Sequence, residues 1–188
     1  PKCELKSRQL SPHGMDLIQR DDRRYMLAVV NHLPSESIEL FELVENDSIE
    51  LIWRGCVDAP ENKYFNDVAL KTDGSFYITH MYDFDSSQWA IAFASMIKNS
   101  TGEVYFWNLE EGFASVPNTK GSFPNGIDLD ANEENLYRNY WFSGKTVKFN
   151  LKSSSAEFEH LGGGKDNLLV TDSGLWVAAH DYSGLESL

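Results

Sequence analysis

Four short segments of this chain carry the side chains best suited to chemistry, and they share one pattern. Each opens with His, Asn or Asp, which can carry a proton or bind a metal, and then places apolar residues at alternate positions. The segments are His13–Leu17 (HGMDL), Asn66–Leu70 (NDVAL), Asn125–Leu129 (NGIDL) and Asp166–Val170 (DNLLV). Such alternation predicts a strand with one buried face. If the repeats surround an axis, their polar starts converge into one site.

Two histidines are the candidates for proton transfer. His13 opens the first segment, and His32 closes the strand-like stretch Val29–His32. Histidine is the side chain best suited to take and return a proton near neutral pH. A single histidine at a strand end is commonly a surface or hydrogen-bonded residue. The place of His13 in the repeated pattern favours a chemical role.

The other three segments supply oxygen ligands. Their polar residues are Asn66, Asp67, Asn125, Asp166 and Asn167. Amide and carboxylate oxygens, with no cysteine and few histidines, suit calcium better than zinc or copper. Asn and Asp also begin turns for purely structural reasons. Three copies, each followed by an apolar residue that starts a strand, favour a metal site.

The elements that must position these residues are β-strands throughout. Strands are predicted at 25–31, 37–43, 48–53, 76–79, 103–107, 127–129, 146–151 and 175–178, with a hairpin turn at 44–47. The segment Ser87–Lys98 is the exception, and it predicts a short helix or a loop over one mouth of a central channel. The segments recur at intervals of roughly 40 to 60 residues, which suits propeller blades of four strands. The fold class is therefore all-β.

Propellers have at least four blades, and four incomplete repeats leave exposed strand edges. We therefore expect residues 1–188 to be a single partial β-propeller domain, truncated at both ends, because the chain starts at Pro1 and stops just after a strand-like run. A complete four-bladed protein is the alternative. The net charge of −13 argues against nucleic acid as a partner. No apolar run approaches the roughly 20 residues that span a bilayer.

Several motifs together resemble the paraoxonase-type lactonases and arylesterases. They are Ser11–Gly14 (SPHG), Val29–His32 (VVNH), Phe65–Val68 (FNDV), Pro124–Ile127 (PNGI), Asp166–Leu168 (DNL) and Leu175–His180 (LWVAAH). They follow the family's order over nearly the whole chain. The resemblance implies a six-bladed β-propeller, of which this chain is a fragment of about four blades. It also implies a calcium-dependent hydrolase of lactones or aryl esters that holds two calcium ions and is related to the gluconolactonase and regucalcin group.

The resemblance assigns a role to each candidate residue. His13 matches the general base that activates water, and His32 matches its partner in a His–His dyad. Ligands of the catalytic calcium are implied at Asn66, Asn125, Asp166 and Asn167; those of a structural calcium at Asp67 and the backbone carbonyl of Met15; and a substrate wall at His180 and His80. His80 departs from the family, because an amide or another small polar residue is expected there.

Three kinds of function remain open. The first is a calcium-dependent lactonase or arylesterase with a small-molecule lactone or ester substrate. The second is a related propeller, either a gluconolactonase-like sugar-lactone hydrolase or a strictosidine-synthase-like protein. The third is a non-catalytic propeller that binds calcium or a protein partner. The histidine pair favours the first, and the absence of a Gly-x-Ser-x-Gly elbow leaves a serine hydrolase without local support.

Overall fold

The computed structural model describes residues 10–45 and 48–180, which form fourteen strands and one helix. The first sheet contains β1 (Pro12–Gln19), β2 (Tyr25–Asn31), β3 (Ser37–Glu45) and β4 (Ile49–Asp58). The second contains β5 (Lys63–Leu70), β6 (Phe76–Asp83), β7 (Glu103–Asn108) and β8 (Gly112–Ser115), with α1 (Gln88–Met96) between β6 and β7. The third contains β9 (Pro124–Leu129), β10 (Asn135–Tyr140), β11 (Lys145–Asn150) and β12 (Ser155–Leu161). A hairpin of β13 (Gly164–Thr171) and β14 (Gly174–His180) follows.

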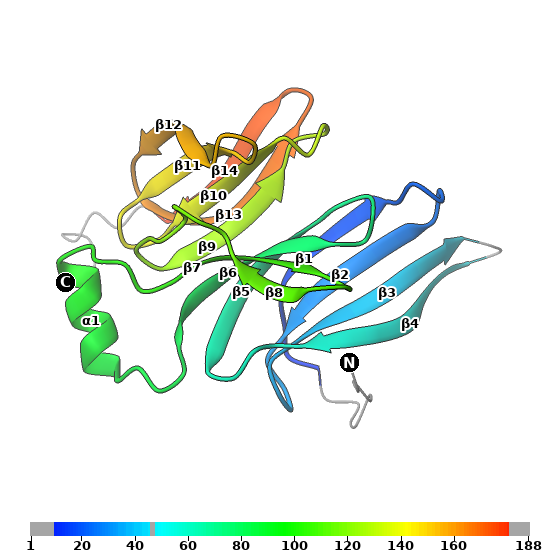
Figure 1. Ribbon diagram of the computed structural model, residues 1–188, viewed down its shortest axis with the longest axis horizontal. Coiled ribbons are helices and arrows are strands. Elements are labelled where there is room, and N and C mark those ends of the chain that lie inside the picture. The colour runs from blue at the N-terminus through cyan, green and yellow to red at the C-terminus, as the bar shows by residue number, and fades with distance from the viewer. Residues whose placement is uncertain (1–9, 46–47, 181–188) are drawn as a thin grey trace.

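Each four-stranded sheet is an antiparallel meander, in which strands pair in the order of the chain. The first strands of successive sheets are neighbours: β1 packs beside β5, β5 beside β9, and β9 beside β13 (Figure 1). These four inner strands carry the four repeated segments. The all-β prediction is therefore confirmed, and the repeated segments lie side by side in a propeller-like arrangement.

Two hydrophobic cores join the three sheets face to face. The first lies between the first and second sheets and contains Val30, Ile38, Val68 and Phe76. The second lies between the second and third sheets and contains Ala69, Val104, Ile127, Leu136 and Phe149. Burial of these side chains holds each sheet on the next and so fixes the spacing of the inner strands.

Glycine at the second position of two repeated segments allows the inner strands to approach closely. A Cβ on Gly14 of β1 would lie 2.3 Å from Oδ1 of Asp67 and 2.5 Å from the carbonyl oxygen of Asn66. A Cβ on Gly126 of β9 would lie 2.6 Å from Cα of Asn167. Real side chains do not fit at such distances, so both positions require glycine. The first and third segments contain it for this reason.

Carboxylates link each inner strand to the next. Asp16 on β1 accepts a hydrogen bond from the backbone N–H of Leu70 on β5 at 2.7 Å. Asp67 on β5 accepts one from Ile127 on β9 at 3.0 Å, and Asp128 on β9 accepts one from Val170 on β13 at 2.7 Å. The polar side chains of the repeated segments therefore hold the strands together as well as forming a candidate site.

The sequence predicted either a short helix or a loop at Ser87–Lys98, and the structure has a helix there, α1. Ser87 caps α1 by accepting a hydrogen bond from the N–H of Ala90, and none of the helical residues is buried. Figure 1 shows α1 at the edge of the molecule, away from the inner strands. Its place over the mouth of a channel stays a prediction. No helix among the described residues is long and apolar enough to cross a membrane.

All eight predicted strand ranges overlap strands of the structure. Two overrun by one residue, since β4 begins at Ile49 rather than at 48 and β11 ends at Asn150 rather than at 151, and β4 extends beyond its predicted range to Asp58. Residues 46–47 of the predicted hairpin turn lie outside the described residues. The outer strands β8 and β12 were missed. They carry no regular buried face, since most of β12 is exposed and β8 is half-buried or exposed, so no alternation marks them in the sequence.

Candidate functional site

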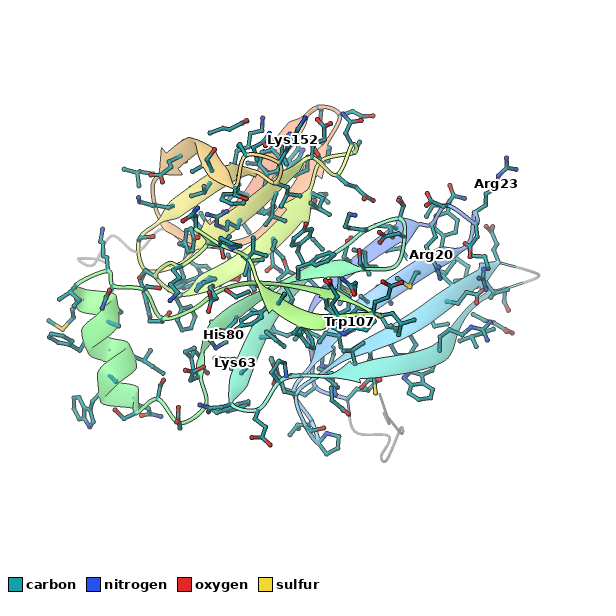
Figure 2. The ribbon with its side chains drawn as sticks, viewed as in Figure 1. Arg20, Arg23, Lys63, His80, Trp107 and Lys152 are labelled. Carbon is teal, nitrogen blue, oxygen red and sulfur yellow. The ribbon has the colours of Figure 1, made fainter. Side chains whose placement is uncertain are left out.

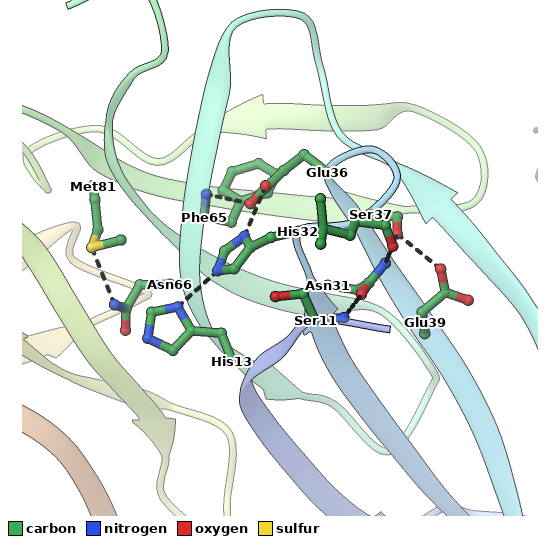
Figure 3. A network of polar contacts seen from close by, with 11 residues as sticks. Ser11, His13, Asn31, His32, Glu36, Ser37, Glu39, Phe65, Asn66 and Met81 are labelled. Carbon is green, nitrogen blue, oxygen red and sulfur yellow. Dashed lines mark hydrogen bonds and ion pairs between the residues drawn. The ribbon is translucent and has the colours of Figure 1, made fainter. Parts of the chain in front are cut away.

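The two predicted histidines are in direct contact. His13 is the second residue of β1, and His32 directly follows β2, the strand that pairs with β1. Nδ1 of His13 and Nε2 of His32 are 2.9 Å apart, with the rings tilted by 65° (Figure 3). Antiparallel pairing of two consecutive strands thus brings together residues 19 positions apart. This distance allows one hydrogen bond between the rings.

His32 is fixed from two further sides. Its Nδ1 lies 2.8 Å from Oε2 of Glu36, which is in the turn between β2 and β3. Its ring stacks on Tyr64 of β5 at 4.3 Å, with the planes 11° apart. The other oxygen of Glu36 accepts a hydrogen bond from the N–H of Phe65 at 2.8 Å. The first and second sheets therefore both hold this imidazole.

The surroundings of His13 favour its neutral form. Partial burial lowers the pKa of His13 below its ordinary value, and the neighbouring His32 lowers this pKa further. The negative charges of Asp166 and Glu36 act in the opposite direction without reversing the shift. A histidine with a lowered pKa is neutral near pH 7 and has a nitrogen free to accept a proton.

Two amide oxygens on the inner strands are buried without a partner among the described residues. Asn66 on β5 is 3% exposed and Asn125 on β9 is 4% exposed, and the Oδ1 atom of each accepts no hydrogen bond from the described residues. Nδ2 of Asn66 lies 3.1 Å from the sulfur of Met81. Figure 3 shows Asn66 next to His13. A buried polar atom without a partner is unusual and calls for an explanation such as an ion.

Asp67 is buried next to Asn66, and both of its oxygens accept backbone hydrogen bonds. Oδ1 accepts from the N–H of Val68 and Oδ2 from the N–H of Ile127, each at 3.0 Å. Burial raises the pKa of Asp67 to about 7, although these bonds lower it and the charges of Asp16 and Asp128 raise it. Burial likewise raises the pKa of Asp16 to about 6. A cation near these carboxylates would relieve this unfavourable burial of charge.

Met15, the other residue predicted for the structural calcium, lies on β1, which packs beside β5. Its thioether sulfur is a poor ligand for calcium, which takes oxygen donors, so the predicted role falls to its backbone carbonyl. The neighbouring Gly14 touches Asn66 and Asp67, which places this part of β1 against the other candidate ligands.

The fourth segment brings Asp166 and Asn167 to the same group of inner strands. Asp166 acts electrostatically on His13, and Cα of Asn167 packs against Gly126. Oδ2 of Asp166 lies 3.1 Å from Nε2 of His180 on β14, whose ring also packs on Trp141 at 4.8 Å. The structure therefore places His180, a predicted wall residue, beside a predicted calcium ligand.

His80, the second predicted wall residue, lies elsewhere. It is 3% exposed within β6, and its ring packs on Phe65 and Tyr105. Its Nε2 is 3.2 Å from Asp83, which also pairs with Lys63 at 2.6 Å, and Figure 2 shows His80 and Lys63 together. Burial lowers the pKa of His80. Within the described chain no hydrogen bond or ring contact joins it to His13 or His32, so its assignment to a substrate wall stays a prediction.

The donor set fits a calcium ion better than a transition metal. Within residues 10–45 and 48–180, no group of three or more His, Cys, Asp or Glu side chains is arranged to hold a metal. The donors that need a partner are the amide oxygens of Asn66 and Asn125, and neutral oxygen donors are ligands that calcium accepts readily. A site here would combine these amide oxygens with the carboxylate of Asp166.

Glu36 and Tyr64 are the site residues that the sequence motifs did not reveal. Glu36 lies in a loop outside the repeated segments, and Tyr64 comes two residues before Asn66. The one available signal is that Glu36 follows His32 by four residues in the turn 32–36, where a chain reversal can bring the two side chains together. Neither residue belongs to one of the four repeated segments, so the alternating pattern did not point to them.

Comparison with known proteins supports both the fold and the family. A luciferin-regenerating enzyme matches with 15% identity and a TM-score of 0.51, over 87% of this chain and 54% of its own. A protein of unknown function from Bacteroides caccae matches with 14% identity and a TM-score of 0.50, over 90% of this chain and 58% of its own. This chain thus spans little more than half the length of either structure. No curated protein matches it significantly. The Arylesterase family profile matches residues 2–183, and the chain therefore belongs to the Arylesterase family.

Proposed function

We propose that this chain forms the catalytic part of a calcium-dependent hydrolase of lactones and aryl esters, built on a six-bladed β-propeller. Family membership supports ester hydrolysis and a small-molecule substrate. Three sheets in a row, with their first strands adjacent, support the propeller, and the remaining blades would lie outside this chain.

One observation carries the proposal: an oriented histidine pair lies beside Asn66, whose buried amide oxygen, like that of Asn125, has no partner within the described chain. The histidine pair alone would suit many proton-transfer sites. The amide oxygens alone would suit a binding protein. Together they match a hydrolase that activates water next to a bound cation.

The residues that would hold the ions divide into two sets. Asn66, Asn125, Asp166 and Asn167 would hold the catalytic calcium, and the carboxylate of Asp67 with the backbone carbonyl of Met15 would hold the structural one. When bound, the catalytic calcium would supply positive charge that polarises a substrate carbonyl and stabilises the developing oxyanion. The raised pKa of Asp67 is consistent with a buried carboxylate whose negative charge a bound cation would stabilise.

The histidines would move the proton. Nδ1 of His13 is engaged with His32, so Nε2 is the ring nitrogen left to face a water molecule. As the water attacks the carbonyl carbon, Nε2 takes its proton and later returns it to the leaving alcohol oxygen. His32 would hold the His13 ring in place during both transfers. No serine nucleophile is needed.

A substrate panel tests this proposal. The whole protein is assayed with phenyl acetate, an aliphatic lactone and a sugar lactone in the presence of calcium. We expect hydrolysis of phenyl acetate and the aliphatic lactone. Turnover of the sugar lactone alone would indicate a gluconolactonase-like enzyme, and no turnover of any of the three would indicate a binding protein.

A further inference from the structure

Glu36 is a buried carboxylate that connects the histidine pair to the second sheet. Its side chain is 6% exposed, and each of its oxygens has one partner. Oε2 faces Nδ1 of His32 at 2.8 Å, and Oε1 accepts from the N–H of Phe65, the residue before Asn66, at 2.8 Å (Figure 3). The partners come from the first and second sheets, so the position of this side chain is defined from both sides.

A carboxylate accepts hydrogen bonds and does not donate them, and this fixes the protons along the whole chain of contacts. Nδ1 of His32 must carry a hydrogen to bond with Glu36. In a neutral ring Nε2 of His32 is then bare, so it can only accept the hydrogen bond from Nδ1 of His13. A neutral His13 with its hydrogen on Nδ1 has a bare Nε2. That atom is the one that a general base needs.

If the hydrogen bond between the two rings ran in the opposite direction, His13 could not act as a base. If Nε2 of His32 carried the hydrogen, it would donate to Nδ1 of His13, and the hydrogen of His13 would sit on Nε2. Nε2 would then have no lone pair for the proton of water. The distance of 2.9 Å between the rings is equally compatible with both directions. The contact with Glu36 selects between them.

We propose that Glu36 is the positioning residue of the histidine pair, because it sets the direction of the hydrogen bonds so that Nε2 of His13 is the base. This inference rests on the proposed function for its catalytic consequence. Glu36 takes no part in the proton transfer itself: the O–H bond of water breaks, the new N–H bond forms at Nε2 of His13, and the proton later leaves with the alcohol. The negative charge of Glu36 also stabilises the positive charge that the pair gains.

The variant Glu36→Gln would reverse the direction with almost no change in shape. The N–H of Phe65 requires an oxygen, so the glutamine oxygen faces Phe65 and its NH₂ group faces Nδ1 of His32. A donor at that place requires Nδ1 of His32 to be bare. The hydrogen then moves to Nε2 of His32 and, in turn, to Nε2 of His13. In the Ser-His-Asp triad the equivalent change of carboxylate to amide lowers kcat about 10⁴-fold through the wrong tautomer.

Two further variants separate this role from a structural one. Glu36→Asp keeps a carboxylate, so it keeps the direction of the hydrogen bonds while lengthening one contact. Glu39→Gln is the matched control: Glu39 is 4% exposed, accepts from Ser37 at 2.8 Å and from Trp53 at 2.7 Å, and forms no hydrogen bond or ion pair with His32 among the described residues. It reports the effect of neutralising a buried glutamate close to the same turn.

The test combines NMR and kinetics on the whole protein labelled with ¹⁵N-histidine. Two-bond ¹H–¹⁵N correlations report the tautomer of each ring without any need for activity. We expect Nδ1–H on His32 and His13 in the wild type, in Glu36→Asp and in Glu39→Gln, and Nε2–H on both rings in Glu36→Gln. In phenyl acetate hydrolysis we expect kcat of Glu36→Gln to fall about 100- to 10,000-fold with KM changed only a few-fold, and Glu39→Gln to retain wild-type kcat.

Two results would overturn the inference. One is Nε2–H on His32 in the wild type, and the other is unchanged tautomers in a folded Glu36→Gln protein. If Glu36→Gln does not fold, Nε2–H on His32 in Glu36→Asp overturns it instead. Failure of the proposed function looks different, since the wild type would then lack hydrolysis while its tautomers still followed residue 36.

Discussion

The histidine pair and the two buried amides, Asn66 and Asn125, differ in how completely the chain satisfies their hydrogen-bonding groups. Each facing nitrogen of His13 and His32 has a partner, and His32 is also held by Glu36 and by stacking on Tyr64. The side-chain oxygens of Asn66 and Asn125 are buried but accept no hydrogen bond within the described residues.

This difference shows which part of the site the chain completes by itself. The histidine region is preorganised by hydrogen bonds and stacking, as a proton-transfer pair must be. The amide region has buried polar atoms and carboxylates with raised pKa values, a combination that costs stability until a cation arrives. Variants of the first region should therefore change rate, and variants of the second should change calcium-dependent stability.

The largest effect is expected from the histidine region. His13→Gln removes the proposed base, so kcat/KM should fall about 10²- to 10⁴-fold in hydrolysis of phenyl acetate. Stabilisation by calcium, measured by thermal unfolding, should remain. His160→Gln, which changes an exposed histidine on β12, is the control and should keep full activity. Wild-type activity in His13→Gln would remove the pair from the mechanism.

The carboxylates of the amide region predict an unusual pH dependence of stability in calcium-free protein. Burial raises the pKa of Asp67 to about 7 and that of Asp16 to about 6. A raised pKa in the folded state means that stability is fully present below the unfolded value of about 3.9 and is lost as pH rises through the folded value.

Chelated protein should therefore lose on the order of a few kcal/mol of unfolding free energy between pH 4 and pH 7 from these two groups. Denaturant unfolding at a series of pH values measures this loss. Saturating calcium should flatten the curve, because it stabilises the ionised carboxylates. Stability that is independent of pH in this window, or that rises through it, would contradict the assignment.

A smaller effect with a distinctive sign is expected at Asn125. Asn125→Leu removes a buried oxygen that has no partner, so the calcium-free protein should gain about 1–3 kcal/mol in unfolding free energy. The same variant should lose its stabilisation by calcium.

Asn139→Leu is the matched control for that change. Asn139 is fully buried like Asn125, but it bonds to Thr146 and to the backbone of Asp166. Its replacement should destabilise the calcium-free protein by about 1–3 kcal/mol. If both variants are destabilised equally, the two amides do not differ, and the contrast between satisfied and unsatisfied groups is wrong.

The smallest effect is a shift in the pH–rate profile. His13 must be neutral to accept a proton, and its pKa is lowered mainly by burial and then by His32. The acid limb of kcat/KM should therefore have its midpoint below the ordinary histidine pKa of about 6.5. A midpoint above that value would mean that the negative charges of Asp166 and Glu36 dominate.

Much of the fold could be predicted because apolar residues alternate in the repeated segments and so mark them as strands. The expectation of one buried face was too simple, since neighbouring sheets bury successive residues of β5 and β9 on both faces. The pairing of His13 with His32 was implied by the family resemblance, and the structure brings the two rings into contact. Glu36 could not be predicted, because its role depends on how one turn folds back onto His32. The surroundings of His80 could not be predicted either: its wall assignment came from the family resemblance and stays a prediction, and its packing on Phe65 and Tyr105 is known only from the structure. The sequence predicts which residues form strands, but it does not predict which side chains from other strands will pack against them.

The most direct test of the account is the calcium dependence of hydrolysis. The whole protein is freed of divalent ions with a chelator, checked for folding at pH 5, where the carboxylates are less destabilising, and assayed with phenyl acetate before and after addition of calcium or magnesium. We expect hydrolysis to be lost when calcium is removed and to return when calcium, but not magnesium, is added back. Undiminished hydrolysis by folded, calcium-free protein would contradict the central claim.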